Sequence, residues 1–380
     1  MSKLHPFLGE RIRERRTALG LSQDQLAKAC GFASGQIISV IEKEGRRIKV
    51  SELARIADAL RVDFDFFFQK EVSNVRAGIL WRERPEVDGK IKEANFLRLC
   101  GRYHKVEKLC GESINCKISS MIKVDFDTLG FEDVSLVAQN EILPKLDLGS
   151  RPAASLTEVL EKRCGIKIIY QDLGEHGSAA SVVGEFGAAI LMNRREAPWR
   201  RNYSFAHELF HIITWDTETI QRQENDPPLW KKAEKFADYF ASVLLLPAAI
   251  IEAELARKGN NLTYMDVVNI SRNMDVSTSA LLWRMVSLRY FKAETVEKVL
   301  SDPDFKNLDK STMAEKWWEP SPLPERFVRL AFKAFTQGNL SRMMLAEYLD
   351  TSLVDLDSVL ADYGIKAEEE AVYETKISIA

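Results

Sequence analysis

The stretch Tyr203-Ser-Phe-Ala-His-Glu-Leu-Phe-His-Ile-Ile213 decides how the central part of the chain folds. His207 and His211 are four residues apart, about one helical turn, so on a helix both imidazoles project from one face and can bind a single zinc ion. Glu208 then lies beside the metal, within reach of a bound water. Zinc lowers the pKa of that water and polarises a peptide carbonyl, and the carboxylate passes the proton to the leaving amine. The stretch predicts a helix that carries metallopeptidase chemistry.

A chance match on a structural helix is the alternative interpretation of this stretch. Its neighbours weigh against that alternative, because apolar side chains flank both histidines and would bury the helix (Phe205, Ala206, Leu209, Phe210, Ile212 and Ile213). Burying two imidazoles without a partner costs free energy. The context therefore favours a metal site.

A catalytic zinc ion needs a third protein ligand and leaves its fourth position for water. No Gly-x-x-His continuation follows His211, so we expect the third ligand from another helix. The segment that ends at Pro247 presents Glu234 and Asp238 one turn apart on one face. A polar loop over 216–228 is long enough to turn this segment back across the first helix.

Two motifs together carry a family resemblance. Phe205-Ala-His-Glu-Leu-x-His211, followed by Glu234-x-x-Ala-x-x-Phe-Ala-x-x-Leu-Leu-x-Pro247, resembles the ImmA/IrrE family of bacterial and phage metallopeptidases. The resemblance implies a zinc site with His207, His211 and Glu234 as ligands and Glu208 as general base. The family usually has Asn where this chain has Asp238, and this carboxylate either competes for the metal or holds a ligand histidine from behind.

The first 70 residues predict a separate bundle of short helices between Phe7 and Phe68. Ser22 and Gln25 are spaced as a capping box, and Gly31 ends the helix that they begin. Two short helices joined by a turn with glycine are typical of a helix-turn-helix.

This region also resembles a known family. Leu21-Ser-Gln-x-x-Leu-Ala-x-x-x-Gly31, Ile38-Ser-x-Ile-Glu42 and Leu53-x-x-Ile-Ala-x-Ala-Leu60 are similar to the phage-repressor-type (Xre) helix-turn-helix. The resemblance implies that the second helix of the pair enters the major groove of a double-stranded DNA operator. The expected base-edge contacts are Ser34, Gln36, Ile37 and Val40, and the expected phosphate contacts are Gln23, Arg46, Arg47 and Lys49.

Two features leave the rotation of that helix in the groove open. One extra residue separates Gly31 from the helix, and Gly35 weakens its first turn. Residues 1–70 hold 13 Lys and Arg against 9 Asp and Glu, a charge of +4, whereas the rest of the chain has 40 against 47, a charge of −7. A basic front end favours nucleic acid as its partner. Because +4 is modest, a dimerisation or docking bundle is the alternative.

Composition bounds the remaining possibilities. With 380 residues the chain is long enough for two or three domains, and 46% hydrophobic and 29% charged residues exclude wholesale disorder and fibrous repeats. No apolar run approaches about 18 residues and no signal peptide begins the sequence, so we expect a cytoplasmic protein without a membrane partner. Five scattered cysteines without a C-x-x-C pair argue against disulfides and a thiolate zinc site.

The expected architecture has four parts. These are a helix-turn-helix bundle over 1–70, a helical connector over 71–150 with a helix across 90–109, a metallopeptidase domain over 151–295, and a helical C-terminal module over 296–380. The peptidase domain is expected to be α+β and zincin-like, with strands over 166–170 and 187–192 in a small antiparallel sheet. In the C-terminal module, Leu345 to Leu349 echo a second helix-turn-helix but lack a basic stripe.

These observations predict a DNA-binding transcriptional regulator with a zinc peptidase domain. The family resemblance implies a protein substrate, a helix-turn-helix repressor, in stress, prophage or toxin–antitoxin control. A transcription factor whose silent peptidase-like domain senses a metal or ligand is the alternative, and a toxin–antitoxin component acting through protein contacts is a third. A homodimer fits the two half-sites typical of this DNA-binding class.

Overall fold

The computed structural model describes residues 8–43, 46–68, 78–86, 88–112, 114, 118–175, 177–258, 262–311 and 319–365. Contacts divide the chain into two compact units. The first comprises Met1–Gly101 and Ile114–Pro320, and the second comprises Arg102–Ser113 and Ser321–Ala380. Each unit is described by itself below.

The N-terminal bundle has four helices and a 3-10 turn. They are α1 (Leu8–Ala18), α2 (Gln23–Ala29), α3 (Gly35–Glu42), α4 (Val50–Ala59) and η1 (Phe64–Phe67). The capping box at the start of α2 is present as predicted: the Ser22 hydroxyl accepts the Gln25 N–H at 3.1 Å, and the Gln25 side chain accepts the Ser22 N–H at 2.7 Å. The elements enclose a core of their own that includes Ile12, Leu26 and Ile38.

Gly35 permits the close approach of α3 to α2. Its N–H donates to Asp24 Oδ1 at 2.8 Å, and a Cβ placed at Gly35 would lie 2.3 Å from the same oxygen and 2.8 Å from the Asp24 nitrogen. Only a hydrogen fits in that space. The glycine that weakens the first turn of α3 is therefore the residue that lets the two helices meet.

Four short strands form a mixed sheet in the first unit. Strands β1 (Leu80–Trp81), β2 (Lys167–Gln171), β3 (Ala179–Gly184) and β4 (Gly187–Asn193) are ordered β1-β3-β4-β2. The pairs β1–β3 and β3–β4 are antiparallel, whereas β2 and β4 are parallel. The prediction of an antiparallel sheet is wrong for the β2–β4 pair. It also missed β1, which has only two residues, and β3, which begins with two alanines and ends with a glycine, residues that are depleted in strands.

Asn193 bonds to the link that accompanies the parallel pairing. The link between β2 and β3 crosses over the end of β4, which brings β2 beside β4 in the same direction. The buried Asn193 amide donates to the carbonyls of Gly174 at 2.8 Å and Gly177 at 2.6 Å, and its oxygen lies 3.3 Å from the Leu173 nitrogen. The hydrogen bonds of this one side chain thus fix the link between β2 and β3.

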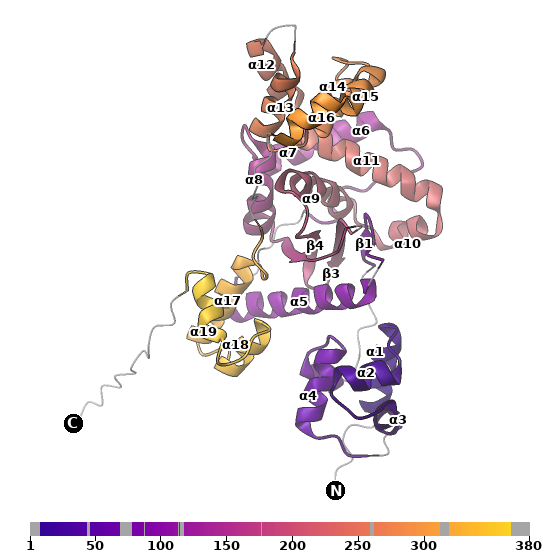
Figure 1. Cartoon of the computed structure of the whole chain (residues 1–380), viewed down its shortest axis with the longest axis vertical. Helices are drawn as coiled ribbons and strands as arrows, with labels where there is room; N and C mark the ends of the chain where they lie inside the picture. The colour runs from indigo at the N-terminus through magenta and orange to yellow at the C-terminus, as the bar shows by residue number, and fades with distance from the viewer. Residues whose placement is uncertain are drawn as a thin grey trace, which may run out of the picture. The chain divides into compact units, whose positions relative to one another are not determined.

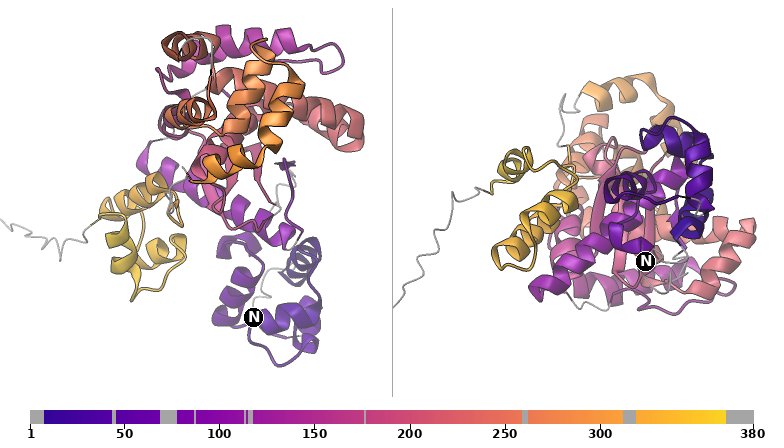
Figure 2. Two further views of the ribbon diagram at one scale, coloured as in Figure 1. Left: turned by 45° about the horizontal axis from the view of Figure 1, so that its top comes forward. Right: turned by 90° about the horizontal axis from the view of Figure 1, so that it is seen from below.

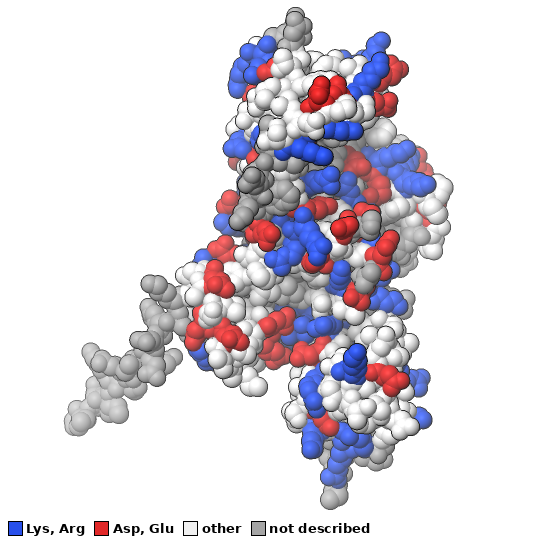
Figure 3. Space-filling view, in the orientation of Figure 1, with Lys and Arg blue, Asp and Glu red and all other residues white. Residues whose placement is uncertain are grey.

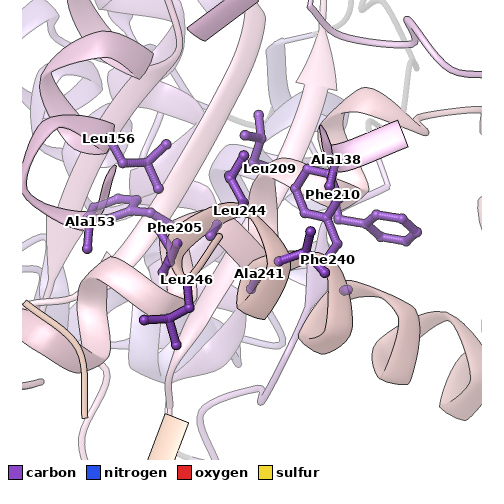
Figure 4. Packing of buried hydrophobic residues seen from close by; sticks show 14 of the residues in the cluster. Ala138, Ala153, Leu156, Phe205, Leu209, Phe210, Phe240, Ala241, Leu244 and Leu246 are labelled. Atoms are coloured by element: carbon purple, nitrogen blue, oxygen red, sulfur yellow. The ribbon is translucent and has the colours of Figure 1, made fainter. Parts of the chain in front are cut away.

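Helices cover both faces of the sheet (Figure 1). Along β4 the side chains alternate, so Ile190 and Met192 pack toward α9 (Pro198–Ile213), while Leu191 packs on the other face against Phe96 of α5 (Gly89–Cys110). Helix α11 (Pro227–Leu245) crosses α9. Figure 4 shows the contact between these two helices, made by Phe205, Leu209, Phe210, Phe240, Ala241 and Leu244. This apolar contact fixes α11 against α9.

The remaining elements of the first unit surround this centre. They are α6 (Phe131–Leu136), η2 (Val137–Ile142), α7 (Leu143–Leu146), α8 (Pro152–Glu158), η3 (Val159–Arg163), α10 (Thr217–Asn225), α12 (Ala248–Lys258), α13 (Tyr264–Asn273), α14 (Thr278–Ser287), α15 (Ala293–Ser301) and α16 (Pro303–Ser311). Helices α13 to α16 contact one another and lie side by side (Figure 2). Among the described helices, none alone has the length and apolar composition of a membrane span; α11 and α12 meet those criteria only when taken together across a 55° bend.

The second unit packs three helices with the end of α5. They are α17 (Glu325–Thr336), α18 (Arg342–Tyr348) and α19 (Leu356–Asp362). The rings of Tyr103 and Phe327 lie 5.4 Å apart, and Arg326 pairs with the buried Glu107 at 2.5 Å. A small apolar core and internal ion pairs, among them Arg326 with Glu107 and the buried Arg102 with Asp350, therefore hold this unit together.

Candidate metal centre

Helices α9 and α11 bring three predicted ligands to one point. His207 Nε2 lies 3.3 Å from Glu234 Oε2, His211 Nε2 lies 3.1 Å from Glu234 Oε1, and the two Nε2 atoms are 3.3 Å apart. One ligand atom from each residue lies within 4.8 Å of the others. The arrangement can hold one metal ion.

The surroundings of this cluster fit a cation and a water. His207 and His211 are 1% and 3% exposed, and Glu208 is fully buried. Both carboxylate oxygens of Glu208 lack an aligned hydrogen-bond donor among the described residues. Buried carboxylates without donors are costly unless something else occupies the space. Two histidines and a carboxylate form a donor set typical of catalytic zinc.

Asp238 contacts His207 on the edge of the ring that faces away from Glu234. Its Oδ1 lies 2.9 Å from His207 Nδ1, and it also accepts a hydrogen bond from Arg82 Nη2 at 3.1 Å. A proton on Nδ1 that donates to this carboxylate leaves the Nε2 lone pair free for a metal. Of the two roles open for Asp238, the geometry favours holding the ligand histidine.

The charged groups of the cluster shift one another's pKa values. Burial opposes protonation of His207, yet hydrogen bonds with Asp238 and Glu234 raise its pKa to about 9. Burial acts against ionisation of Glu234, and its bonds to the two histidines lower its pKa to about 2. Burial raises the pKa of Glu208, opposed by the imidazoles and by the nearby Ser181 hydroxyl, which is not aligned for a full hydrogen bond. A carboxyl group with a raised pKa suits proton transfer near neutral pH.

Three residues near the cluster were missed by the sequence analysis. Trp230 stacks on His211, with ring centres 5.8 Å apart and planes 10° apart, and it lies one helical turn before Glu234, so helical spacing alone could have indicated it. Ser181 of β3 and Arg82 reach the site from distant parts of the chain. No local pattern marks either of them.

A polar cleft of about 940 Å³ opens beside the cluster. Glu234 and Asp238 line it, together with Tyr203 and Tyr239 and side chains of α14. Six serines belong to its wall (Ser178, Ser204, Ser242, Ser277, Ser279 and Ser287). A polar cleft of this size next to the ligands can receive an extended peptide segment.

Two parts of the chain match known families. Residues 12–67 match the helix-turn-helix family, and residues 161–285 match the IrrE N-terminal-like domain. An uncharacterized transcriptional regulator in the ATPase CF(0) region of Rhodospirillum rubrum is 44% identical over 75 residues, which are 20% of this chain and 68% of that protein. The chain belongs to the helix-turn-helix family. It also carries an IrrE-like domain, residues 161–285, which contains His207, His211 and Glu234.

Other relatives are similar over segments of comparable length. An uncharacterized HTH-type transcriptional regulator of Sinorhizobium medicae is 42% identical over 62 residues, 16% of this chain and 44% of that protein. One of Rickettsia prowazekii is 38% identical over 69 residues, 18% of this chain and 52% of that protein. The similarity to these proteins therefore spans about half of their length and less than a fifth of this chain.

The helix-turn-helix domain, residues 12–67, exposes most of the predicted base-edge residues on α3. Ser34, Gln36 and Val40 are exposed, whereas Ile37 is half-buried and packs against the core of the domain. Gln36 has the amide geometry that reads adenine. Ile37 therefore contributes to packing as well as to the surface.

The side chains predicted to contact phosphates differ in whether they already have a partner within the domain. Arg47 and Lys49 are exposed, but Gln23 donates to Glu42 at 2.8 Å and Arg46 pairs with Glu52. Figure 3 shows basic side chains over the surface of this domain. Arg47 and Lys49 can meet phosphates directly, while Gln23 and Arg46 would first exchange an internal partner.

Proposed function

We propose that the chain is a DNA-binding transcriptional regulator whose IrrE-like domain is a zinc-dependent endopeptidase. The observation that carries the proposal is the convergence of His207, His211 and Glu234 beside a buried Glu208 without a donor. Glu208 is fully buried, and the nearby Ser181 hydroxyl is not aligned for a full hydrogen bond with it, which supports a role in chemistry at the cluster.

In this proposal, different residues bind the metal, transfer the proton and bind the substrate. A zinc ion held by His207, His211 and Glu234 would supply an activated water and polarise the scissile carbonyl. Glu208 accepts a proton from the attacking water and returns it to the leaving amine, which its raised pKa favours. The cleft beside Glu234 receives the substrate chain.

We further propose that α3 reads an operator as part of a homodimer and that the substrate is itself a helix-turn-helix repressor in stress, prophage or toxin–antitoxin control. The exposed face of α3 and the basic side chains of the domain support DNA binding. The class of substrate rests on the resemblance to the ImmA/IrrE family. A regulator that binds near the repressor it cleaves meets its substrate at high local concentration.

Glu208→Gln tests the peptidase assignment. The amide keeps the size of the side chain and cannot accept the proton, so we expect zinc content to stay the same and cleavage of a co-expressed repressor to fall at least about 100-fold. Glu252→Gln is the matched control, because Glu252 is an exposed glutamate outside the lining of the cleft. Cleavage that survives in Glu208→Gln contradicts the mechanism, and purified native protein without zinc contradicts the metal site.

One observation favours a second function. His207, His211 and Glu208 are almost fully buried. Of the four residues of the cluster, it is the fourth, Glu234, that lines the cleft. Such a closed site suits a transcription factor that senses a metal through a silent peptidase-like domain. Zinc in the wild-type protein together with no cleavage of any tested repressor would support this function over the peptidase.

A further inference from the structure

Strand β1 completes the sheet from outside the two family-matched segments. Leu80 is opposite Ser181 and Trp81 is opposite Ala180, and the Arg82 N–H then donates to the Ala179 carbonyl at 3.1 Å. These residues follow the helix-turn-helix match at 12–67 and precede the IrrE-like match at 161–285. The edge of the sheet nearest to Glu208 is thus covered by the region that joins the two domains.

Arg82 reaches from this edge into the surroundings of the metal centre. Its Nη2 donates to Asp238 Oδ1 at 3.1 Å and its Nη1 donates to Ser204 Oγ at 3.3 Å. Its guanidinium carbon lies 5.9 Å from the centre of the Tyr203 ring, and Tyr203 in turn donates to the Asp238 carbonyl at 2.6 Å. One side chain therefore links β1 to α9 and α11.

The partner of Arg82 is the carboxylate that holds a ligand histidine. Asp238 Oδ1 accepts from both Arg82 and His207 Nδ1. Because the Asp238 side chain is 48% exposed, water competes for it, and a second fixed donor restricts its orientation. An ion pair whose carboxylate is half exposed adds little to folding stability, so stability alone does not explain this arrangement. Its effect falls on the orientation of His207.

We propose that Arg82 is a positioning residue of the metal centre. Its guanidinium keeps Asp238 against His207 Nδ1, so the affinity for zinc depends on β1 being paired with β3. The proposal rests on the metal site of the proposed function. It assigns a role in metal binding to a segment that neither family match includes.

Zinc affinity of the full chain tests the proposal. Dissociation constants are measured by competition with a chromogenic chelator at fixed pH and salt. We expect Arg82→Ala to weaken zinc binding about tenfold, at the low end for residues that support a metal ligand from behind. Arg82→Lys keeps the charge beside Asp238 and should recover part of the affinity. Arg84→Ala is the matched control, since Arg84 belongs to the same segment but pairs with Glu93 at 2.9 Å, and it should bind like the wild type.

A double-mutant cycle separates positioning from a general structural role. If Arg82 acts through Asp238, Arg82→Ala adds no loss of affinity in an Asp238→Ala background, which has no oxygen for either donor. Additive losses, or equal affinities of Arg82→Ala and Arg84→Ala, overturn the proposal. Should Arg82→Ala fail to fold by circular dichroism, Arg82→Lys takes its place in the same cycle. A wild-type chain that binds no zinc contradicts the proposed metal site instead, so the two failures are distinct.

Discussion

The helix-turn-helix domain and the IrrE-like domain place the side chains that we propose to be functional in opposite environments. On α3, Gln36 and Val40 are exposed above a core that contains Ile38 and Ile41. On α9, His207 and Glu208 are themselves as buried as their neighbours in the core. The first domain can therefore change what it recognises without changing how it folds. In the IrrE-like domain, the residues proposed for chemistry also belong to the buried core. Each buried charge there therefore needs a partner from another element.

Removing a large core side chain next to the metal centre should have the largest effect. Phe240→Ala in α11 deletes a buried ring that lies 5.5 Å from the Phe210 ring, and we expect a loss of about 3–5 kcal/mol in the free energy of unfolding together with weaker zinc binding. Ile38→Ala in the other domain should cost about 2–5 kcal/mol and leave zinc affinity unchanged. Urea unfolding and chelator competition measure the two quantities. Unchanged zinc affinity in Phe240→Ala would contradict the coupling of folding and metal binding in the IrrE-like domain.

A methyl group at Gly35 should have an intermediate effect. Gly35→Ala forces a carbon against Asp24, and we expect a loss of about 1–3 kcal/mol in the stability of the helix-turn-helix domain. Gly101→Ala in α5 is the control, because a Cβ there meets nothing within 4 Å and alanine favours a helix. Thermal unfolding followed by circular dichroism measures both. If Gly35→Ala is as stable as the wild type, α2 and α3 can move apart with little loss in the free energy of unfolding.

Substitution of an exposed reading residue should have the smallest effect on stability. We expect Gln36→Ala to change the free energy of unfolding by no more than about 0.5 kcal/mol and to remove about 1–3 kcal/mol of discrimination at one A·T pair of the operator. Gln25→Ala should do the reverse, because Gln25 caps α2. Binding to operator variants at constant salt provides the measurement. A large loss of stability in Gln36→Ala would contradict the separation of recognition from folding.

Local patterns predicted what lies within one helix or one turn. The spacing of His207 and His211 predicted their shared face, and the capping box at Ser22 predicted the start of α2. The long-range partners could not be predicted in this way. Arg82 is 122 positions from Ser204 and 156 from Asp238, and it extends a strand of two residues that has no periodicity to detect.

The parallel pairing of β2 with β4 escaped prediction for a related reason. The link that places β2 beside β4 is held by the buried Asn193 amide, which donates to the carbonyls of Gly174 and Gly177. Hydrophobic periodicity reports which side of a strand is buried, but it does not report which strand lies beside it. The order of the strands therefore could not be predicted from the apolar pattern.

The position of β1 in the chain also orders events during synthesis. Leu80 leaves the ribosome about 100 residues before its partner Ser181, and at roughly 5–20 residues per second this interval is about 5–20 s. Over that interval the whole sequence of the N-terminal domain has been synthesised and can fold. The partner strand of β1, β3, has not yet been synthesised. The nascent chain can thus complete its helix-turn-helix domain before Arg82 can reach Ser204 and Asp238.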